Sequence, residues 1–285
     1  MFRKSTIIAI IFGFVLFSTG VVYSQEKSAL EKEYEAAFDV YQLIFDDYKS
    51  AHEDYVLARS QYQRFQTLTS QNNARNATIR MLEERDEVTI KYLEALKKKL
   101  ISVETIESGR RDRLISQIDE EINWFSGHKE RLSSAGTLEE VVEDSNEAKE
   151  RYDLLQSVVF ESLSVVPYSD TVRLGERLDE NFADTKEIVN QIRAESREEY
   201  RFDTEKLERI DKWIFDTESK IERGKEKLAE AQLTLDSFSE GQEARGRSTH
   251  EQVYGNMIRE ITESIRDMKD ASLFNKEIMK EIKTK

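Results

Sequence analysis

The side chains that could support acid–base chemistry or bind a metal ion are three histidines, His52, His128 and His250, and 57 acidic residues. A metal site on a helix face needs histidine and carboxylate ligands three or four residues apart. The acidic residues nearest to His52 lie one, two and five positions away, and those around the other two histidines fit no better. With so many acidic residues, a close carboxylate pair is no indication of an acid–base couple. We therefore predict solvated or packed histidines and no metal site.

Other kinds of catalytic chemistry lack the residues that they need. The chain has no cysteine, which excludes disulfides, thiolate nucleophiles and cysteine-ligated metal sites. It contains no phosphate-binding glycine loop, nucleophile elbow or EF-hand loop. Long helices also offer few concave pockets that shield a reaction from water. We predict a protein that is not an enzyme, has no catalytic residues and takes no cofactor.

Tyrosines recur every seven residues in the stretch 34–68, at Tyr34, Tyr41, Tyr48, Tyr55 and Tyr62. The residue three positions after each is Ala, Ile or Phe, so apolar positions alternate at spacings of three and four, the heptad of a left-handed coiled coil. A row of rings could stack on sugars or peptides. Large and small residues that alternate along one face are more typical of close helix packing. We predict that the five tyrosines form a packing seam.

The apolar face of this stretch is not uniform along its length. Phe38 and Phe45 widen the face, whereas His52 and Arg59 take the equivalent positions in the later blocks. A wide apolar stripe needs more neighbours than a narrow one. We therefore expect the N-terminal end of this helix to be the more deeply packed.

The composition favours long helices over sheets. The 285 residues include one proline and ten glycines, and 38% are hydrophobic against 35% charged. Few breakers favour helices, and the small apolar fraction suits narrow seams better than a thick core. Fourteen phenylalanines, eleven tyrosines and a sustained apolar period argue against disorder. We predict an all-α protein, an elongated antiparallel coiled coil or long helical bundle of about five helices in residues 25–285.

Turn signals divide the first half of this region. The polar segment Thr67–Thr78 predicts a first turn near residue 72. Around Gly109 we expect a nearly continuous helix, because no proline or turn dipeptide accompanies the glycine. Ser133–Gly136 precedes a capping box formed by Thr137 and Glu140, which predicts a turn near residue 135.

The second half contains fewer breakers. Pro167 predicts a helix end, with Ser169 or Asp170 as the next cap and a sub-boundary near residues 167–170. From Thr171 to Phe238 the apolar pattern predicts one long helix, with a stutter or hinge in the polar stretch 194–201. A last turn is expected near residue 243.

Residues 1–24 have the layout of an export signal. Arg3 and Lys4 precede an apolar run, Ile7–Phe17, and a short tail suits cleavage after Ser24. The alternative is an uncleaved membrane anchor, because residues 6–23 are uncharged and reach the lower length limit for spanning a bilayer. Either way the positive end stays in the cytoplasm. The remainder is predicted to be exported, either periplasmic or extracellular or anchored to the outer face of the membrane.

The formal net charge of −14 disfavours nucleic acid and anionic lipid surfaces as partners. The short basic runs Lys97–Lys99 and Arg110–Arg113 are interpreted as solvated helix faces.

The sequence predicts a non-enzymatic structural or interaction protein, a stalk, spacer or scaffold that contacts a protein partner or a second copy of itself through helix faces. The alternative is an extracytoplasmic sensor or small-ligand-binding bundle, which a polar-lined pocket between helices would favour.

Overall fold

A computed structural model describes residues 28–195, 202–239 and 247–284, and in these ranges the chain forms six helices and no strand. The helices are α1 (Ala29–Phe65), α2 (Leu68–Ser102), α3 (Ser108–Leu132), α4 (Leu138–Ala194), α5 (Thr204–Ser239) and α6 (Arg247–Lys283). Consecutive helices pack against each other. The predicted all-α helical bundle is confirmed, with six helices in place of about five.

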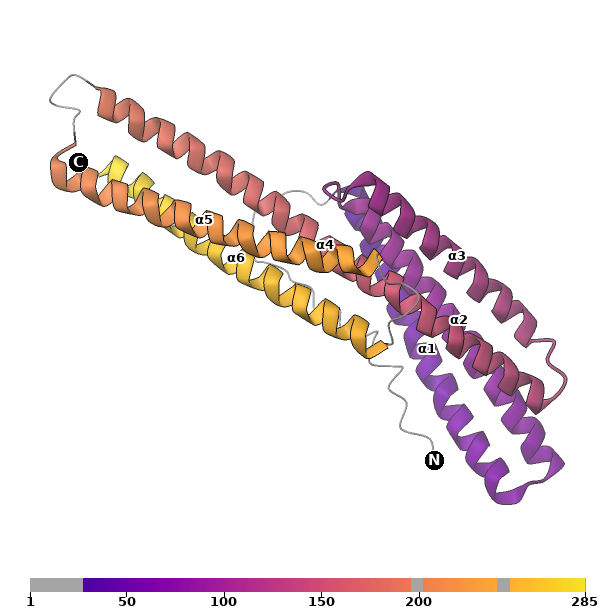
Figure 1. The fold of residues 1–285 in the computed structure, drawn as a ribbon. Coiled ribbons are helices and arrows are strands. Elements are labelled where there is room, and N and C mark those ends of the chain that lie inside the picture. Colours follow the sequence, from indigo (N-terminus) through magenta and orange to yellow (C-terminus); the bar gives the residue numbers. More distant parts are fainter. Residues whose placement is uncertain (1–27, 196–201, 240–246, 285) are drawn as a thin grey trace.

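The helices form two bundles that are arranged end to end and share α4 (Figure 1). One bundle contains α1, α2, α3 and the first half of α4, and the other contains the second half of α4 with α5 and α6. The 57 residues of α4 give it a length of about 86 Å at 1.5 Å per residue. The molecule is therefore elongated along this one helix.

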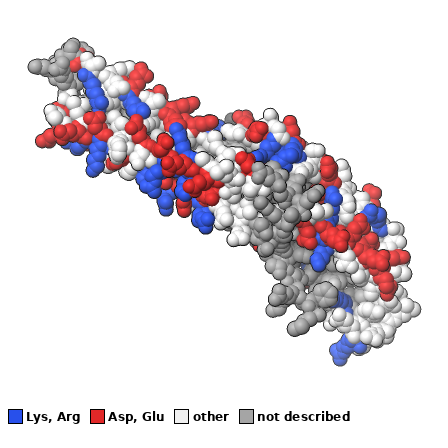
Figure 2. Space-filling model, viewed as in Figure 1, with Lys and Arg blue, Asp and Glu red and all other residues white. Residues whose placement is uncertain are grey.

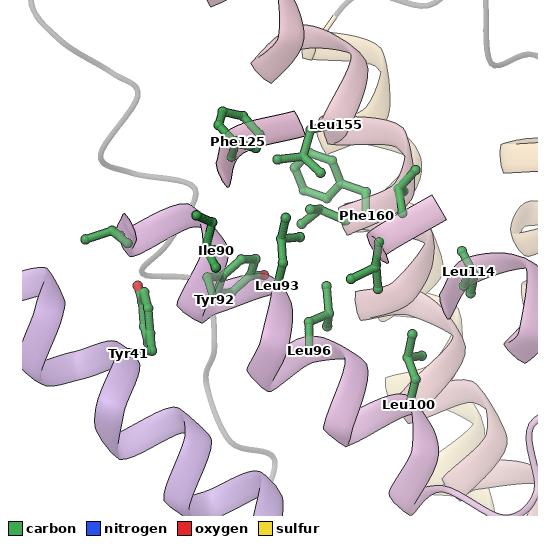
Figure 3. Close-up of a cluster of buried hydrophobic side chains, with 14 of the residues drawn as sticks. Tyr41, Ile90, Tyr92, Leu93, Leu96, Leu100, Leu114, Phe125, Leu155 and Phe160 are labelled. Atoms are coloured by element: carbon green, nitrogen blue, oxygen red, sulfur yellow. The ribbon is translucent and has the colours of Figure 1, made fainter. Parts of the chain in front are cut away.

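The buried apolar residues form two clusters, and the first extends from α1–α4 into α5 and α6, at Leu235 and Met257. Leucines of α2, including Leu93, Leu96 and Leu100, gather with Phe125 of α3 and Phe160 of α4 in the first core (Figure 3). The second core contains buried residues of α4, α5 and α6, among them Phe182, Ile210 and Ile278. Tyr168 of α4 packs against both cores, so the two are adjacent at this point of α4.

The first turn lies earlier than predicted. Helix α1 ends at Phe65, and Gln66 adopts a left-handed conformation with φ 48°. Thr67 and Ser70 then form a capping box that starts α2. The predicted turn near residue 72 is wrong, because the polar residues there are the exposed side of a helix whose other side, at Ala74 and Thr78, is buried.

The connection between α2 and α3 was not expected. The sequence predicts a nearly continuous helix around Gly109, but α2 ends at Ser102 and α3 begins at Ser108. Val103 and Ile106 are buried within this connection. Apolar burial therefore stabilises the chain reversal, without the proline or glycine that usually marks one.

The turn near residue 135 is confirmed. The hydroxyl oxygen of Thr137 accepts the backbone N–H of Glu140 at 3.2 Å, and the Glu140 carboxylate accepts the backbone N–H of Thr137 at 3.1 Å. These two bonds complete the predicted capping box at the start of α4.

The helix end predicted at Pro167 is wrong, since α4 continues through Pro167 to Ala194, and Ser169 and Asp170 lie inside the helix. The residues just before the proline, 155–165, are buried on every side of the helix apart from the half-buried Leu163. Packing of helices on all sides outweighs the local cost of a proline in the helix.

The single long helix predicted from Thr171 to Phe238 is also wrong. Helix α4 ends at Ala194 and α5 begins at Thr204, with the Asp203 carboxylate accepting the backbone N–H of Lys206 at 2.7 Å. The intervening stretch is mostly polar, and its residues 196–201 lie outside the described residues. The turn expected near residue 243 falls in a second such gap, residues 240–246.

Among the described helices, none combines the length and the apolar character that a membrane span requires. Residues 1–27, with the predicted signal or anchor and the cleavage position after Ser24, lie outside the described residues.

Candidate functional site

The heptad tyrosines lie on the side of α1 that faces α2. Tyr34, Tyr41 and Tyr48 are buried, whereas Tyr55 and Tyr62 are half-buried. The ring of Tyr41 lies 5.5 Å from the ring of Tyr92 in α2. The first three rings of the row are therefore inside the protein, where they are not available as a platform for a ligand.

Burial also changes the ionisation of these phenols. It raises the pKa of Tyr34 to about 12, with smaller contributions from Glu35 and Glu31. Burial likewise raises the pKa of Tyr41 and of Tyr48. These hydroxyls keep their protons at any pH near neutrality.

A buried carboxylate of α4 binds two arginines of α3 where the two bundles meet. Glu161 has a side chain only 1% exposed and accepts hydrogen bonds from Arg113 at 2.5 and 3.1 Å. Nε of Arg110 lies 3.7 Å from the same carboxylate, and its Nη2 donates to Asp236 of α5 at 2.5 Å. One polar network therefore connects α3, α4 and α5 at the joint.

The hydrogen bonds of this network favour the charged form of Asp236. Burial alone raises the pKa of Asp236, but the hydrogen bonds from Arg110 and Gln232 outweigh that effect, so the pKa is lowered. Tyr168, which packs beside the network, has a pKa raised by burial and by the Asp236 charge. Asp236 thus remains ionised as the acceptor of Arg110.

The interpretation of Arg110–Arg113 as a solvated basic run is wrong for Arg110, whose side chain is 13% exposed. A signal for this network does exist in the sequence. Glu161 is the only charged residue in the run 157–166, SVVFESLSVV. A single carboxylate within an apolar helix segment needs a cationic partner when it is buried.

The histidines occupy three different environments. His52 is half-buried and His250 is buried. His128 is fully buried, with Nδ1 2.5 Å from Oδ2 of Asp86 and Nε2 3.1 Å from the backbone oxygen of Asp144. The ligand atoms of His128, Asp144 and Glu147 lie within 4.8 Å of one another. The prediction of no metal site considered only ligands three or four residues apart on a single helix. It therefore missed this group, whose residues come from both α3 and α4.

An open groove of about 410 Å³ runs over α2 between α1 and α3. Ion pairs cross it, from Lys97 to Asp119 at 2.6 Å and from Lys98 to Glu33 at 3.3 Å. Figure 2 shows acidic and basic side chains interspersed along both bundles on the face in view. The groove therefore presents charges that are already paired within the protein.

No protein family, curated protein or solved structure significantly matches this chain. Its function is therefore inferred from its own residues and geometry.

Proposed function

We propose that the chain is an exported, non-enzymatic spacer or scaffold that holds interaction surfaces at a fixed separation. The observation that carries this proposal is the continuity of α4, which runs through both bundles and is buried on nearly all sides at the point where they meet. A helix of this kind transmits the orientation of one bundle to the other.

The joint resists bending because movement there would be costly. Rotation of one bundle against the other would expose apolar residues of the segment 155–165. It would also separate Asp236 of α5 from Arg110 of α3, an ion pair that connects the two bundles. The Arg110 side chain is only 13% exposed, so the loss of this partner costs more than the loss of an exposed ion pair. A stiff joint is what a spacer needs.

Helix faces are the proposed contact surfaces. The outer side of α1 carries Leu43 and Leu57, which are 65% and 60% exposed and lie two heptads apart. The heptad of α1 and its packing against α2 support a coiled-coil geometry for this pair. The acidic charge disfavours nucleic acid. The proposed partner is therefore a protein or a second copy of this chain.

A second candidate, the extracytoplasmic small-ligand binder, rests on the groove between α1 and α3. That groove is open, and two ion pairs occupy it. A ligand would have to replace these pairs in contact with solvent, where binding gains little. The spacer is the better supported of the two.

Solution scattering combined with light scattering on residues 25–285 tests the elongated shape. A compact domain of this length has a radius of gyration of about 18 Å. We expect a much larger value and a maximum dimension above about 86 Å, the length of α4. A compact particle would contradict the proposal.

Spin labels test the stiffness directly, because the chain has no cysteine of its own. Cysteines introduced at the exposed positions Gln63 and Lys280 place one label at the far end of each bundle (Figure 1). A single narrow distance distribution is expected for a spacer, and a broad one would indicate a hinge.

The mass of the mature protein from its native host tests export. A chain starting at Gln25 indicates a cleaved signal, whereas full-length protein in the cytosolic fraction contradicts export.

A further inference from the structure

We propose that His128, Asp144 and Glu147 form a binding site for one divalent transition-metal ion of the zinc type, between α3 and α4. The imidazole comes from α3, and the two carboxylates lie three residues apart on one face of α4. One histidine nitrogen and two carboxylate oxygens are donors that zinc accepts, with a fourth position left for water. This site is independent of the spacer function.

Asp86 of α2 supplies the outer support that such a site requires. Its carboxylate is fully buried and lies 2.5 Å from Nδ1 of His128. A metal-binding histidine generally donates its other ring N–H to a carboxylate, which fixes the orientation of the ring. Trp124 stacks on the imidazole at a centroid distance of 5.0 Å and an angle of 11°. The ring is thus held with Nε2 directed at α4.

The proton on Nε2 is what the metal ion replaces. Nε2 lies 3.1 Å from the backbone oxygen of Asp144, which can only accept a hydrogen bond, so Nε2 must carry a proton in that contact. When the metal binds, the N–H bond breaks, the nitrogen electron pair bonds to the metal, and the proton leaves to solvent. The ligand atoms of the three residues already lie within 4.8 Å of one another, and the half-buried Asp144 and exposed Glu147 have room to turn toward the ion.

Arg131 holds the site closed when no metal is bound. Its Nη2 donates to both carboxylate oxygens of Glu147, at 3.0 and 3.1 Å. The Arg131 side chain is 55% exposed, so it can turn into water when Glu147 binds the ion. Loss of this arginine should free Glu147 and remove a repelling charge. Metal affinity is therefore expected to rise when Arg131 is replaced.

Titration of residues 25–285 with Zn²⁺ by calorimetry, and with Co²⁺ by visible absorption, tests the site. We expect the wild type to bind one ion per chain. In Glu147→Gln and in Asp144→Asn the affinity for the ion should fall by a factor of about ten or more. The matched control is Glu143→Gln, an exposed residue of the same helix that loses the same charge. Asp86→Asn, with its fold checked by circular dichroism, should weaken binding about 10- to 100-fold without removing a ligand.

The opposite change gives a second, independent readout. Arg131→Gln is expected to bind Zn²⁺ more tightly than the wild type. Its control is Arg80→Gln, which loses the same charge at an exposed position on α2 and should leave the affinity unchanged. Absence of binding at millimolar Zn²⁺ would overturn the proposal. So would equal binding by the wild type and Glu147→Gln, because the ion would then be held by the acidic surface in general.

Discussion

The guanidinium group of Arg113 binds the carboxylate of Glu161 through two hydrogen bonds, at 2.5 and 3.1 Å, where α3 meets the middle of α4. The two residues are 48 positions apart in the sequence. Because Glu161 is almost completely buried, its charge depends on the cations beside it. The stability of the packing of α3 against α4 should therefore be sensitive to Arg113.

Replacement of Arg113 by methionine should lower the free energy of unfolding by about 3 kcal/mol, the lower end of the cost of breaking a buried ion pair. The lower end is expected because Arg110 remains 3.7 Å from the carboxylate. Urea unfolding measures the change. The control is Arg80→Met, whose partner Asp54 is 59% exposed and whose loss should cost less than about 1 kcal/mol. Equal losses in the two variants would show that Glu161 is accessible to water.

Two glycines in helix interiors should respond to alanine in opposite ways. A Cβ atom on Gly127 of α3 would meet nothing within 4 Å, so Gly127→Ala should stabilise the protein by up to about 1 kcal/mol through helix propensity. On Gly224 of α5 it would lie 3.1 Å from Cγ of Met268 and 3.5 Å from the backbone oxygen of Ser264, both in α6. Gly224→Ala should therefore lower the melting temperature. A gain in both variants would show that α5 and α6 do not approach so closely.

Truncation of the heptad tyrosines should have effects graded along α1. Tyr41→Ala together with Tyr48→Ala removes two buried rings, and each loss of a buried aromatic side chain costs about 3–5 kcal/mol. Tyr62→Ala, at the half-buried end of the row, should cost clearly less. Thermal melting compares the three proteins. An unchanged melting temperature of the double variant would contradict the packing role and would favour the alternative, a row of rings that binds a ligand.

Features set by neighbouring residues in the sequence were predictable. The capping box of Thr137 and Glu140 needs only residues three apart, and it starts α4 where the sequence places it. The helix end predicted at Pro167 was wrong because it is not set by neighbouring residues alone. The outcome there depends on helices distant in the sequence that surround α4, and no local pattern reports on them.

The candidate sites were not predictable for the same physical reason. The contact of His128 with Asp86 joins residues 42 positions apart, on two helices. A search for ligands at spacings of three and four residues examines only one helix. The apolar segment around Glu161 indicates that a cation must be nearby, but it does not indicate which of the 43 lysines and arginines provides it.

Buried phenols should make the protein unfold in alkali. Burial raises the pKa of Tyr34 to about 12 and raises that of Tyr41, Tyr92 and Tyr152. In the unfolded chain these groups lose their protons near pH 10. Above about pH 10 the folded state therefore binds more protons than the unfolded state, and stability falls as the pH rises. Below that pH both states are protonated and stability is at its full value.

A pH titration followed by phenolate absorbance and by circular dichroism measures this effect. We expect the phenolate signal of the buried tyrosines to appear together with the loss of helix, because these groups ionise once the chain unfolds. Tyr92→Phe removes one such ionisation and should shift the alkaline unfolding midpoint upward, while the half-buried Tyr62, changed in the same way, serves as the control. If all tyrosines ionised near pH 10 with the helices intact, the rings would be in contact with water and the burial of the α1–α2 seam would be wrong.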